Sequence, residues 1–239
     1  IAVVDNAIML ASKRYHNVVP TNSDIKWGSE KVFASDIMRK NKDLRVAIPE
    51  TLVSAVLQAG SMGLTLNPAA GECYLIPRAT TRGGSTFIAY ASPSYRGLIK
   101  TAVDSGAILY GVAEVVYSND TFEYFGKTAK PNHVVDVMKP RGDPVGAYAL
   151  AKLPCGDSIA SWMSKEDILK VKEKSDNPGG MMWNEFWMEG WCKAVLRRAQ
   201  KTWPRSKQLN DAIQILNDNE GVNFEPGTPA QPDIDGESV

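Results

Sequence analysis

Between Ile48 and Leu153 the chain alternates between two hydrophobic periodicities, and their order restricts the folds that it can adopt. Apolar residues recur at helical spacing after Pro49, and alternating or β-branched runs follow from about residue 72. The resulting order is helix, hairpin, helix, strands and helices, which is typical of helices packed on an antiparallel sheet. We therefore expect an α+β fold, in which a small antiparallel sheet with a hairpin packs against helices and the C-terminal part is helical.

Proline, glycine and serine mark the expected ends of the first elements. Pro49 suits the first turn of a helix that stops near Gly63. The runs at residues 72–77 and 86–91 predict a hairpin. Ser92 and Pro93 then predict the cap and first turn of a second helix, which ends at Gly106.

Later elements are predicted by β-branched and aromatic runs and by one clear cap. Strands are expected at residues 108–117, 121–125, 145–153 and 158–163. Ser164 is expected to cap a charged helix that reaches about Lys174. One continuous helix is expected from Trp183 to Trp203, because Pro204 would stop it.

Charge is distributed unevenly along the chain. The 27 basic and 27 acidic residues cancel, but residues 208–239 contain seven acids and no Lys or Arg. Residues 1–207 therefore carry an excess of seven positive charges. A basic body with an acidic end suggests a nucleic-acid surface, although a solvated surface explains the same asymmetry equally well.

We expect three regions along the chain. Residues 1–47 read as an N-terminal helical oligomerisation segment, residues 48–207 as the core, and residues 208–239 as an acidic C-terminal segment with a disordered tail after Glu220. No run approaches the roughly 20 apolar residues of a membrane span, so no membrane partner is expected. Because the chain begins with Ile1 rather than Met, we expect the natural N-terminus to be trimmed or missing.

Most catalytic and metal-binding patterns are absent from the sequence. His16 and His133 have no neighbouring Cys or His, and the three cysteines lack metal-ligand spacing, which fits a reducing cytoplasm. Gly126-Lys127-Thr128 looks like the end of a phosphate-binding loop, but Thr121 stands where that motif needs its first glycine. We therefore expect neither an enzyme nor a metal site.

The most informative segment is a row of basic residues in the long helix expected near the C-terminus. Lys193, Arg197 and Lys201 recur at i, i+4 and i+8, with Arg198 beside them. The row advances by about 6 Å per step, and like charges at this spacing repel. An extended polyanion would relieve the repulsion without being read by sequence. A solvated face remains the alternative, and a core role is favoured for Trp183, Trp187 and Trp191.

A second basic cluster is expected on the helix after the hairpin. Arg96 and Lys100 are again four residues apart, and Tyr95 beside them offers a surface on which a base could stack. Arg78 ends the strand before the hairpin turn, and Lys152 lies on a strand whose alternation exposes it. By composition alone, Arg78 and Lys152 are ordinary surface residues.

Five segments resemble, in the same order, the motifs of the RecT family of phage single-strand annealing proteins, part of the RecT/Red-beta recombinase superfamily. The first is GLTLNP followed by GECYLIP at residues 63–77, and the second is SYRGLI at residues 94–99 followed by Ser105-Gly106. The others are VYSNDTF at 116–122, YALAKL at 148–153 and KAVLRR at 193–198, followed by Lys201 and Pro204. The likeness covers residues 52–204. Cys192 departs from it, because the family pattern has Lys there.

The resemblance implies an annealing-protein-like core that binds single-stranded DNA and pairs complementary strands without ATP, another cofactor or a covalent step. It implies a homo-oligomer, ring or helical filament, that holds the annealed duplex intermediate. The implied partners in the bacterial cytoplasm are a 5′→3′ exonuclease and a host single-strand-binding protein. By motif, the positions assigned to DNA are Tyr95, Arg96, Lys152, Lys193, Arg197, Arg198 and Lys201, to which charge adds Arg78 and Lys100.

Other classes of protein remain open at this point. A single-strand coat protein without annealing activity would bind strands in the same way. A nuclease would need a metal cluster that the sequence lacks. A protein-interaction module is favoured only by the acidic C-terminal segment, which we expect to contact the exonuclease or the single-strand-binding protein.

Overall fold

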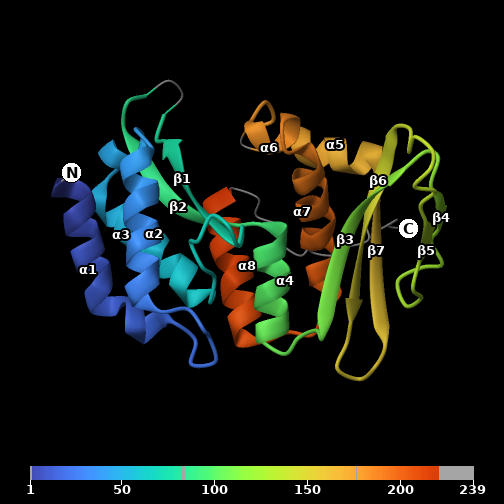
Figure 1. Ribbon diagram of the computed structural model, residues 1–239, viewed down its shortest axis with the longest axis horizontal. Helices are drawn as coiled ribbons and strands as arrows, with labels where there is room; N and C mark the ends of the chain where they lie inside the picture. Colours follow the sequence, from blue (N-terminus) through green and yellow to red (C-terminus); the bar gives the residue numbers. More distant parts are fainter. Residues whose placement is uncertain (1, 82–83, 176, 221–239) are drawn as a thin grey trace, which may run out of the picture.

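The structure, a computed structural model, describes residues 2–81, 84–175 and 177–220. It is an α+β fold in which small antiparallel sheets pack against helices (Figure 1). The fold class expected from the sequence is therefore confirmed. The predicted disordered tail after Glu220 and the centre of the predicted hairpin turn lie outside the described residues.

The N-terminal part consists of three helices and a hairpin. α1 (Ala2–Val18), α2 (Trp27–Lys40) and α3 (Pro49–Ser61) are joined by a polar loop and a 3-10 turn at Leu44–Val46. α3 begins with Pro49 at its first position, as the sequence predicts. Side chains of α3 are buried against α1 and against the hairpin, where they form the first of two large apolar cores.

The hairpin consists of β1 (Cys73–Ala79) and β2 (Phe87–Pro93), paired antiparallel. Because side chains alternate along a strand, the pairing sorts them onto two faces. One face contributes Cys73, Leu75, Ala89 and Ala91 to the first core. The opposite side, here called the hairpin face, carries the remaining alternate residues, namely Tyr74, Ile76, Arg78, Ile88, Tyr90 and Ser92.

The helix after the hairpin begins two residues later than the sequence predicts. Ser92 and Pro93 are the last residues of β2, and α4 (Tyr95–Asp104) is capped by Ser94. The Ser94 hydroxyl accepts from the Gly97 amide at 3.1 Å and donates to the Gly71 carbonyl at 2.6 Å. The prediction failed because both Ser92 and Ser94 can cap a helix, and only the pairing of Pro93 with Cys73 decides between them.

Replacing Ser94 by alanine is expected to destabilise the protein by about 1 kcal/mol, the usual cost of losing such a cap. The measurement is the urea dependence of unfolding, followed by circular dichroism. Ser54→Ala is the matched control, because Ser54 is exposed on α3, where alanine favours the helix. Equal stability of the Ser94→Ala variant and the wild type would show that the cap contributes nothing.

The C-terminal part is built on a three-stranded antiparallel sheet. Its order is β3 (Tyr110–Tyr117), β6 (Pro144–Lys152) and β7 (Ser158–Ser164), and β6 and β7 are joined by the tight turn that the sequence predicts. A separate small ladder pairs β4 (Thr121–Glu123) with β5 (Asn132–Val134). The sequence predicts β4 but not the three-residue β5.

A buried network of charged groups fixes this small ladder to the main sheet. The Asp120 side chain is 1% exposed and accepts from Arg141 at 2.6 Å and from the Tyr117 amide at 2.9 Å. His133 lies 3.0 Å from the same carboxylate. His133 is therefore a satisfied core histidine, which explains its isolation in the sequence. Arg141 was not singled out by sequence reasoning.

One face of the main sheet is covered by helices. α5 (Lys165–Glu173), capped by Ser164 as predicted, and α7 (Trp187–Ala199) pack on β6 and β7. Together with α4 they enclose the second large core (Figure 1). A short 3-10 turn at Gln200–Thr202 ends α7, and Trp203 is buried behind it.

The continuous helix predicted from Trp183 to Trp203 is wrong. The chain instead forms α6 (Met181–Asn184), breaks at Phe186, and restarts as α7. α6 packs back on α7 at Gly190, where an added Cβ would lie 3.0 Å from the Met182 carbonyl. The absence of a side chain at Gly190 therefore allows α6 and α7 to approach closely.

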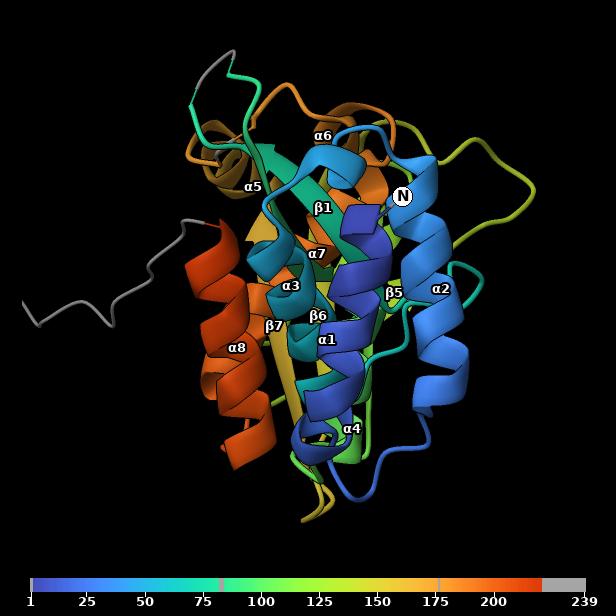
Figure 2. The same ribbon diagram turned by 90° about the vertical axis from the view of Figure 1, so that its left-hand side faces the viewer.

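The last described helix, α8 (Lys207–Glu220), joins the two large cores. Ala212 and Ile215 pack in the N-terminal core, and Leu209 and Ile213 pack in the C-terminal core. Figure 2 shows α8 beside α3, with the main sheet behind.

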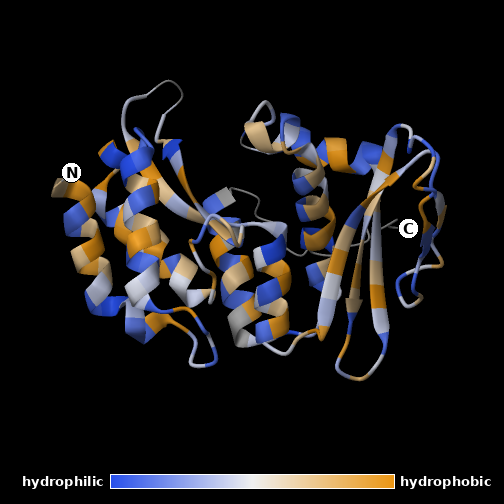
Figure 3. Cartoon of the chain, viewed as in Figure 1, coloured by the Kyte–Doolittle hydropathy of each residue, from blue (hydrophilic) through white to orange (hydrophobic). Residues whose placement is uncertain are grey.

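Hydropathy follows this arrangement. Hydrophilic and hydrophobic colours alternate around α1, α2 and α4, as expected for helices with one buried stripe (Figure 3). No helix of the described ranges is long and apolar enough to cross a membrane.

Candidate nucleic-acid interface

The hairpin face is turned toward α7 and α8, and basic side chains of the hairpin and of α7 form hydrogen bonds there. Arg78 lies on β1, with its guanidinium carbon 4.7 Å from the centre of the Tyr90 ring. It also donates to the backbone carbonyl of Asn219, near the end of α8. Arg78, which composition alone identifies as an ordinary surface residue, therefore packs against the Tyr90 ring and the end of α8.

Lys193 reaches the hairpin face from α7. Its amine lies 3.2 Å from the Ser92 hydroxyl, although the two residues are 101 positions apart. Only 7% of Lys193 is exposed. Burial raises the pKa of the neighbouring Cys73 thiol to about 12, while the positive charge of Lys193 acts in the opposite direction. The positive charge of Lys193 therefore also acts on Cys73, whose side chain lies on the core side of the hairpin.

The next residue of the row, Arg197, points to α8. Its guanidinium donates to the Asn217 side-chain oxygen at 3.1 Å. Lys201, one turn further, is exposed. Partial burial of its amine lowers the pKa of Lys201, and the positive charges of Arg197 and Arg198 lower it further. Lys201, in the 3-10 turn after α7, therefore lies close enough to Arg197 and Arg198 to be repelled by them.

Arg198 leaves the row and points to a different neighbour. Its guanidinium lies 3.2 Å from the Asp167 carboxylate on α5. Since successive residues of a helix are about 100° apart, Arg197 and Arg198 face different sides of α7. The structure therefore divides a cluster that the sequence suggests is one.

Tyr95 and Arg96 lie at the start of α4, next to the hairpin. The Arg96 Nε lies 3.3 Å from the Tyr95 hydroxyl, and a weak ion pair of 3.9 Å joins Arg96 to Glu189 on α7. Tyr74 of the hairpin face is close to Arg96 as well, since both side chains approach Gly71. Tyr74 is 46% exposed, so its ring is available for stacking.

Lys100 and Lys152 are not brought to the hairpin face. Lys100 lies 2.5 Å from Asp104 and 3.8 Å from Asp24. Lys152 is at the end of β6, where its amine donates to the Gly156 carbonyl in the turn before β7. Lys100 is held by carboxylates and Lys152 by a turn carbonyl, and none of these partners belongs to the hairpin face.

Sequence reasoning missed the residues of the hairpin face that carry no charge. Tyr74, Tyr90 and Ser92 stand with Arg78 on alternate positions of the two strands. The alternation could have revealed them once the register of the hairpin was known. The three tryptophans of the α6–α7 segment belong to the second core or pack against it, as expected.

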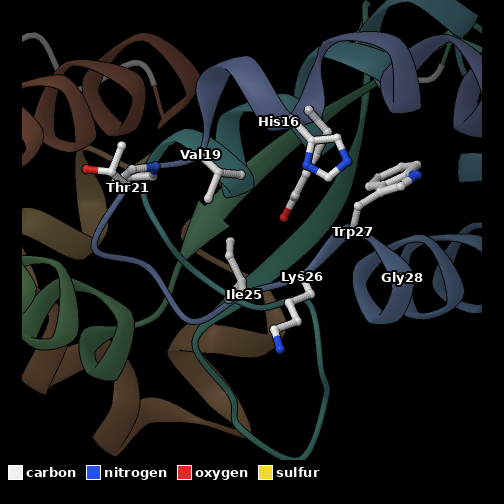
Figure 4. Close-up of a pocket in the computed structure, with 9 residues that line it drawn as sticks. His16, Val19, Thr21, Ile25, Lys26, Trp27 and Gly28 are labelled. Carbon is white, nitrogen blue, oxygen red and sulfur yellow. The ribbon is translucent and has the colours of Figure 1, made fainter.

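A recess of about 490 Å³ lies between the end of α1 and the start of α2, away from these residues. His16, Val19, Ile25 and Trp27 surround it, and the amine of Lys26 points away (Figure 4). The Tyr15 and Trp27 rings, whose centres are 4.7 Å apart, also line it. Among the described residues, no cluster of three or more His, Cys, Asp or Glu side chains is placed to hold a metal ion.

Comparison with known proteins agrees with the motifs. A sequence model of the RecT family matches residues 32–229. The chain is also 29% identical over 180 residues to Protein RecT of Escherichia coli strain K12. That alignment covers 74% of this chain and 65% of the relative, so the chain spans somewhat less than two thirds of the protein that it matches. Because the family model covers most of its length, the chain belongs to the RecT family.

Proposed function

We propose that this protein binds single-stranded DNA along the hairpin face and anneals complementary strands in recombination, without ATP or metal. One observation carries the proposal. Arg78 of the hairpin bonds to α8, and on α7 Lys193 bonds to the hairpin while Arg197 bonds to α8, so basic residues of two distant segments border the same surface. Cations arranged in this way suit successive phosphates of a strand.

The mechanism follows from what annealing requires. Phosphates must be neutralised so that two strands can approach, while base edges stay free to test a partner. The acceptors that Asn217 and Asn219 present to Arg197 and Arg78 would exchange for phosphate oxygens. The exposed ring of Tyr74 and the half-buried ring of Tyr95 would support bases by stacking without selecting a sequence. No cofactor is required because duplex formation is itself favourable.

Assembly into a ring or helical filament extends this short surface into a long one. The proposal is supported by exposed apolar side chains on two separate parts of the molecule. Met9 and Val32 lie on α1 and α2, within the proposed oligomerisation segment, and Val137 and Met138 after β5 are 86% and 87% exposed. Exposed apolar side chains of this kind are candidate contacts between subunits. The proposed partners are a 5′→3′ exonuclease and a single-strand-binding protein in the bacterial cytoplasm.

Mixing the protein with two complementary oligonucleotides, one with a fluorophore and one with a quencher, tests the proposal. Without nucleotide or divalent ion, the protein is expected to accelerate quenching strongly. The logarithm of strand affinity should fall with that of salt concentration with a slope of about −2, since each of three phosphate contacts contributes roughly −0.7. Binding without faster pairing would instead identify a non-annealing coat protein. Cleavage of the strands with magnesium would identify a nuclease.

A further inference from the structure

A second recess lies at the outer edge of β7, away from the hairpin face. It encloses about 290 Å³ and is lined by Tyr124, Gly126, Lys127, Ser161, Trp162 and Arg198. β7 is the last strand of its sheet, and the chain after β4 follows its edge, where the Ala160 amide donates to the Lys127 carbonyl at 2.7 Å. The recess therefore joins residues of α7, β7 and the loop between β4 and β5.

Two aromatic side chains form walls of this recess and are fixed in place. The Trp162 ring is 4.8 Å from Phe122 at an interplanar angle of 31°, and it lies over Gly146, where any Cβ would collide with the indole. The Tyr124 hydroxyl donates to the Ala160 carbonyl at 3.3 Å. Because both side chains are already fixed, neither loses conformational freedom when a planar group binds in the recess, which lowers the entropic cost of binding.

Two basic residues, Lys127 and Arg198, line the same recess as the rings. Lys127 follows Gly126, whose φ of 98° turns the loop toward β7. The Arg198 guanidinium is oriented by Asp167 at 3.2 Å, and a guanidinium has five N–H donors of which one carboxylate uses only part. Burial raises the pKa of Tyr124, and the positive charge of Arg198 opposes this, so the cation acts on the aromatic wall.

Two basic residues and two aromatic rings form a surface that is chemically complementary to a nucleotide. The cations match a phosphate group, and the rings match a base, which stacks on aromatic side chains whatever its sequence. The volume of about 290 Å³ admits one such unit rather than a length of strand. The Gly126-Lys127-Thr128 segment, which fails as a nucleotide-binding loop, thus contributes its lysine to a site of another kind.

The recess and the hairpin face are separated by α7. Arg197 points to α8 and Arg198 to α5, from adjacent positions of one helix. We propose that the recess holds one nucleotide of a second single strand, of the kind that annealing brings in, while the first strand occupies the hairpin face. This inference rests on the proposed function and assigns a separate place to the incoming strand.

The double variant Lys127→Ala/Arg198→Ala tests the inference. The control Lys130→Ala/Lys170→Ala removes the same charge, and Lys170 also lies near Asp167, at 4.0 Å, without lining the recess. A first strand is bound to each protein, and a labelled complementary strand is then added. The recess variant should bind the first strand as the wild type does but pair the second roughly tenfold more slowly, since its capture loses two phosphate contacts.

A crosslinking experiment tests the recess directly. A second strand that is non-complementary and carries 5-iododeoxyuridine should crosslink to Trp162 or Tyr124 in the wild type and much less in the variant.

Each result decides one of the two proposals. Equal pairing rates and equal crosslinking in variant and wild type would overturn the inference and leave the proposed function intact. Loss of first-strand binding in the variant would also overturn it, because the recess would then belong to the first-strand surface. If the wild type binds strands but does not anneal them, the proposed function fails, and the crosslink still decides whether a second strand enters the recess.

Discussion

Replacing Lys193 and Arg197 together by methionine is expected to weaken single-strand binding roughly 100-fold, if each lost contact is worth about 1.4 kcal/mol. Annealing should fall with it. Both residues lie at the junction of the hairpin face with α7 and α8. The salt dependence should also become shallower, by about 1.4 in the logarithmic slope, because two phosphate contacts are lost. Methionine keeps the apolar stems, so packing around the buried Lys193 is largely preserved.

The measurement is fluorescence anisotropy of a labelled strand at several salt concentrations, with the annealing assay beside it. Lys130→Met/Lys139→Met is the matched control, because both lysines are exposed and belong to the β4–β5 region. Equal losses in the two double variants would mean that only net charge matters. No loss in either would show that strands bind elsewhere on the protein.

Replacing Asp120 by asparagine is expected to destabilise the fold by about 3 kcal/mol, the lower end of the cost of removing one partner of a buried ion pair. Its carboxylate has Arg141, His133 and the Tyr117 amide around it. The variant leaves the Arg141 guanidinium without its closest anion. The free energy of unfolding in urea at pH 7 measures the effect. Asp136→Asn, at an exposed carboxylate paired with Lys139, serves as control and should change stability little.

The same substitution predicts a pH dependence. Hydrogen bonds from Arg141 lower the pKa of Asp120 well below its usual range, against the opposing effect of burial. A carboxyl group with a lowered pKa in the folded state stabilises the fold above its unfolded pKa of about 3.9 and loses this contribution as pH falls below it. The stability difference between wild type and Asp120→Asn should therefore be largest near neutral pH and shrink toward pH 2. A difference that stays constant over this range would contradict an ionised Asp120 as its source.

Local signals in the sequence located most elements. The hairpin strands were predicted to within two residues because their alternation is regular, and the Ser164 cap was found because a serine stands directly before a charged helical segment with acids in its first turn. Elements that depend on distant contacts were missed. β5 has three residues and is held through His133 by the buried Asp120, and the break at Phe186 exists because α6 folds back on Gly190. Neither contact leaves a periodic pattern.

Only some residues of the candidate interface could be predicted from the sequence. Spacing along one helix identified Lys193 and Arg197 as neighbours, but it could not show that Arg198 pairs with Asp167 on α5. It also gave no sign that Arg78 lies near α8, since Arg78 and Asn219 are 141 positions apart. Such convergence depends on how the elements pack, and a single sequence records it only indirectly.

The position of α8 has a consequence for how the protein is made. A chain leaving the ribosome folds from its N-terminal end as soon as a domain is complete. Here the N-terminal core contains Ala212 and Ile215, although the rest of its apolar residues lie before position 92. That core stays unfinished until the last described helix has been synthesised, and the C-terminal core needs Leu209 of the same helix. Both halves of the molecule, and the surface between them, are therefore completed together, after translation has reached the end of α8.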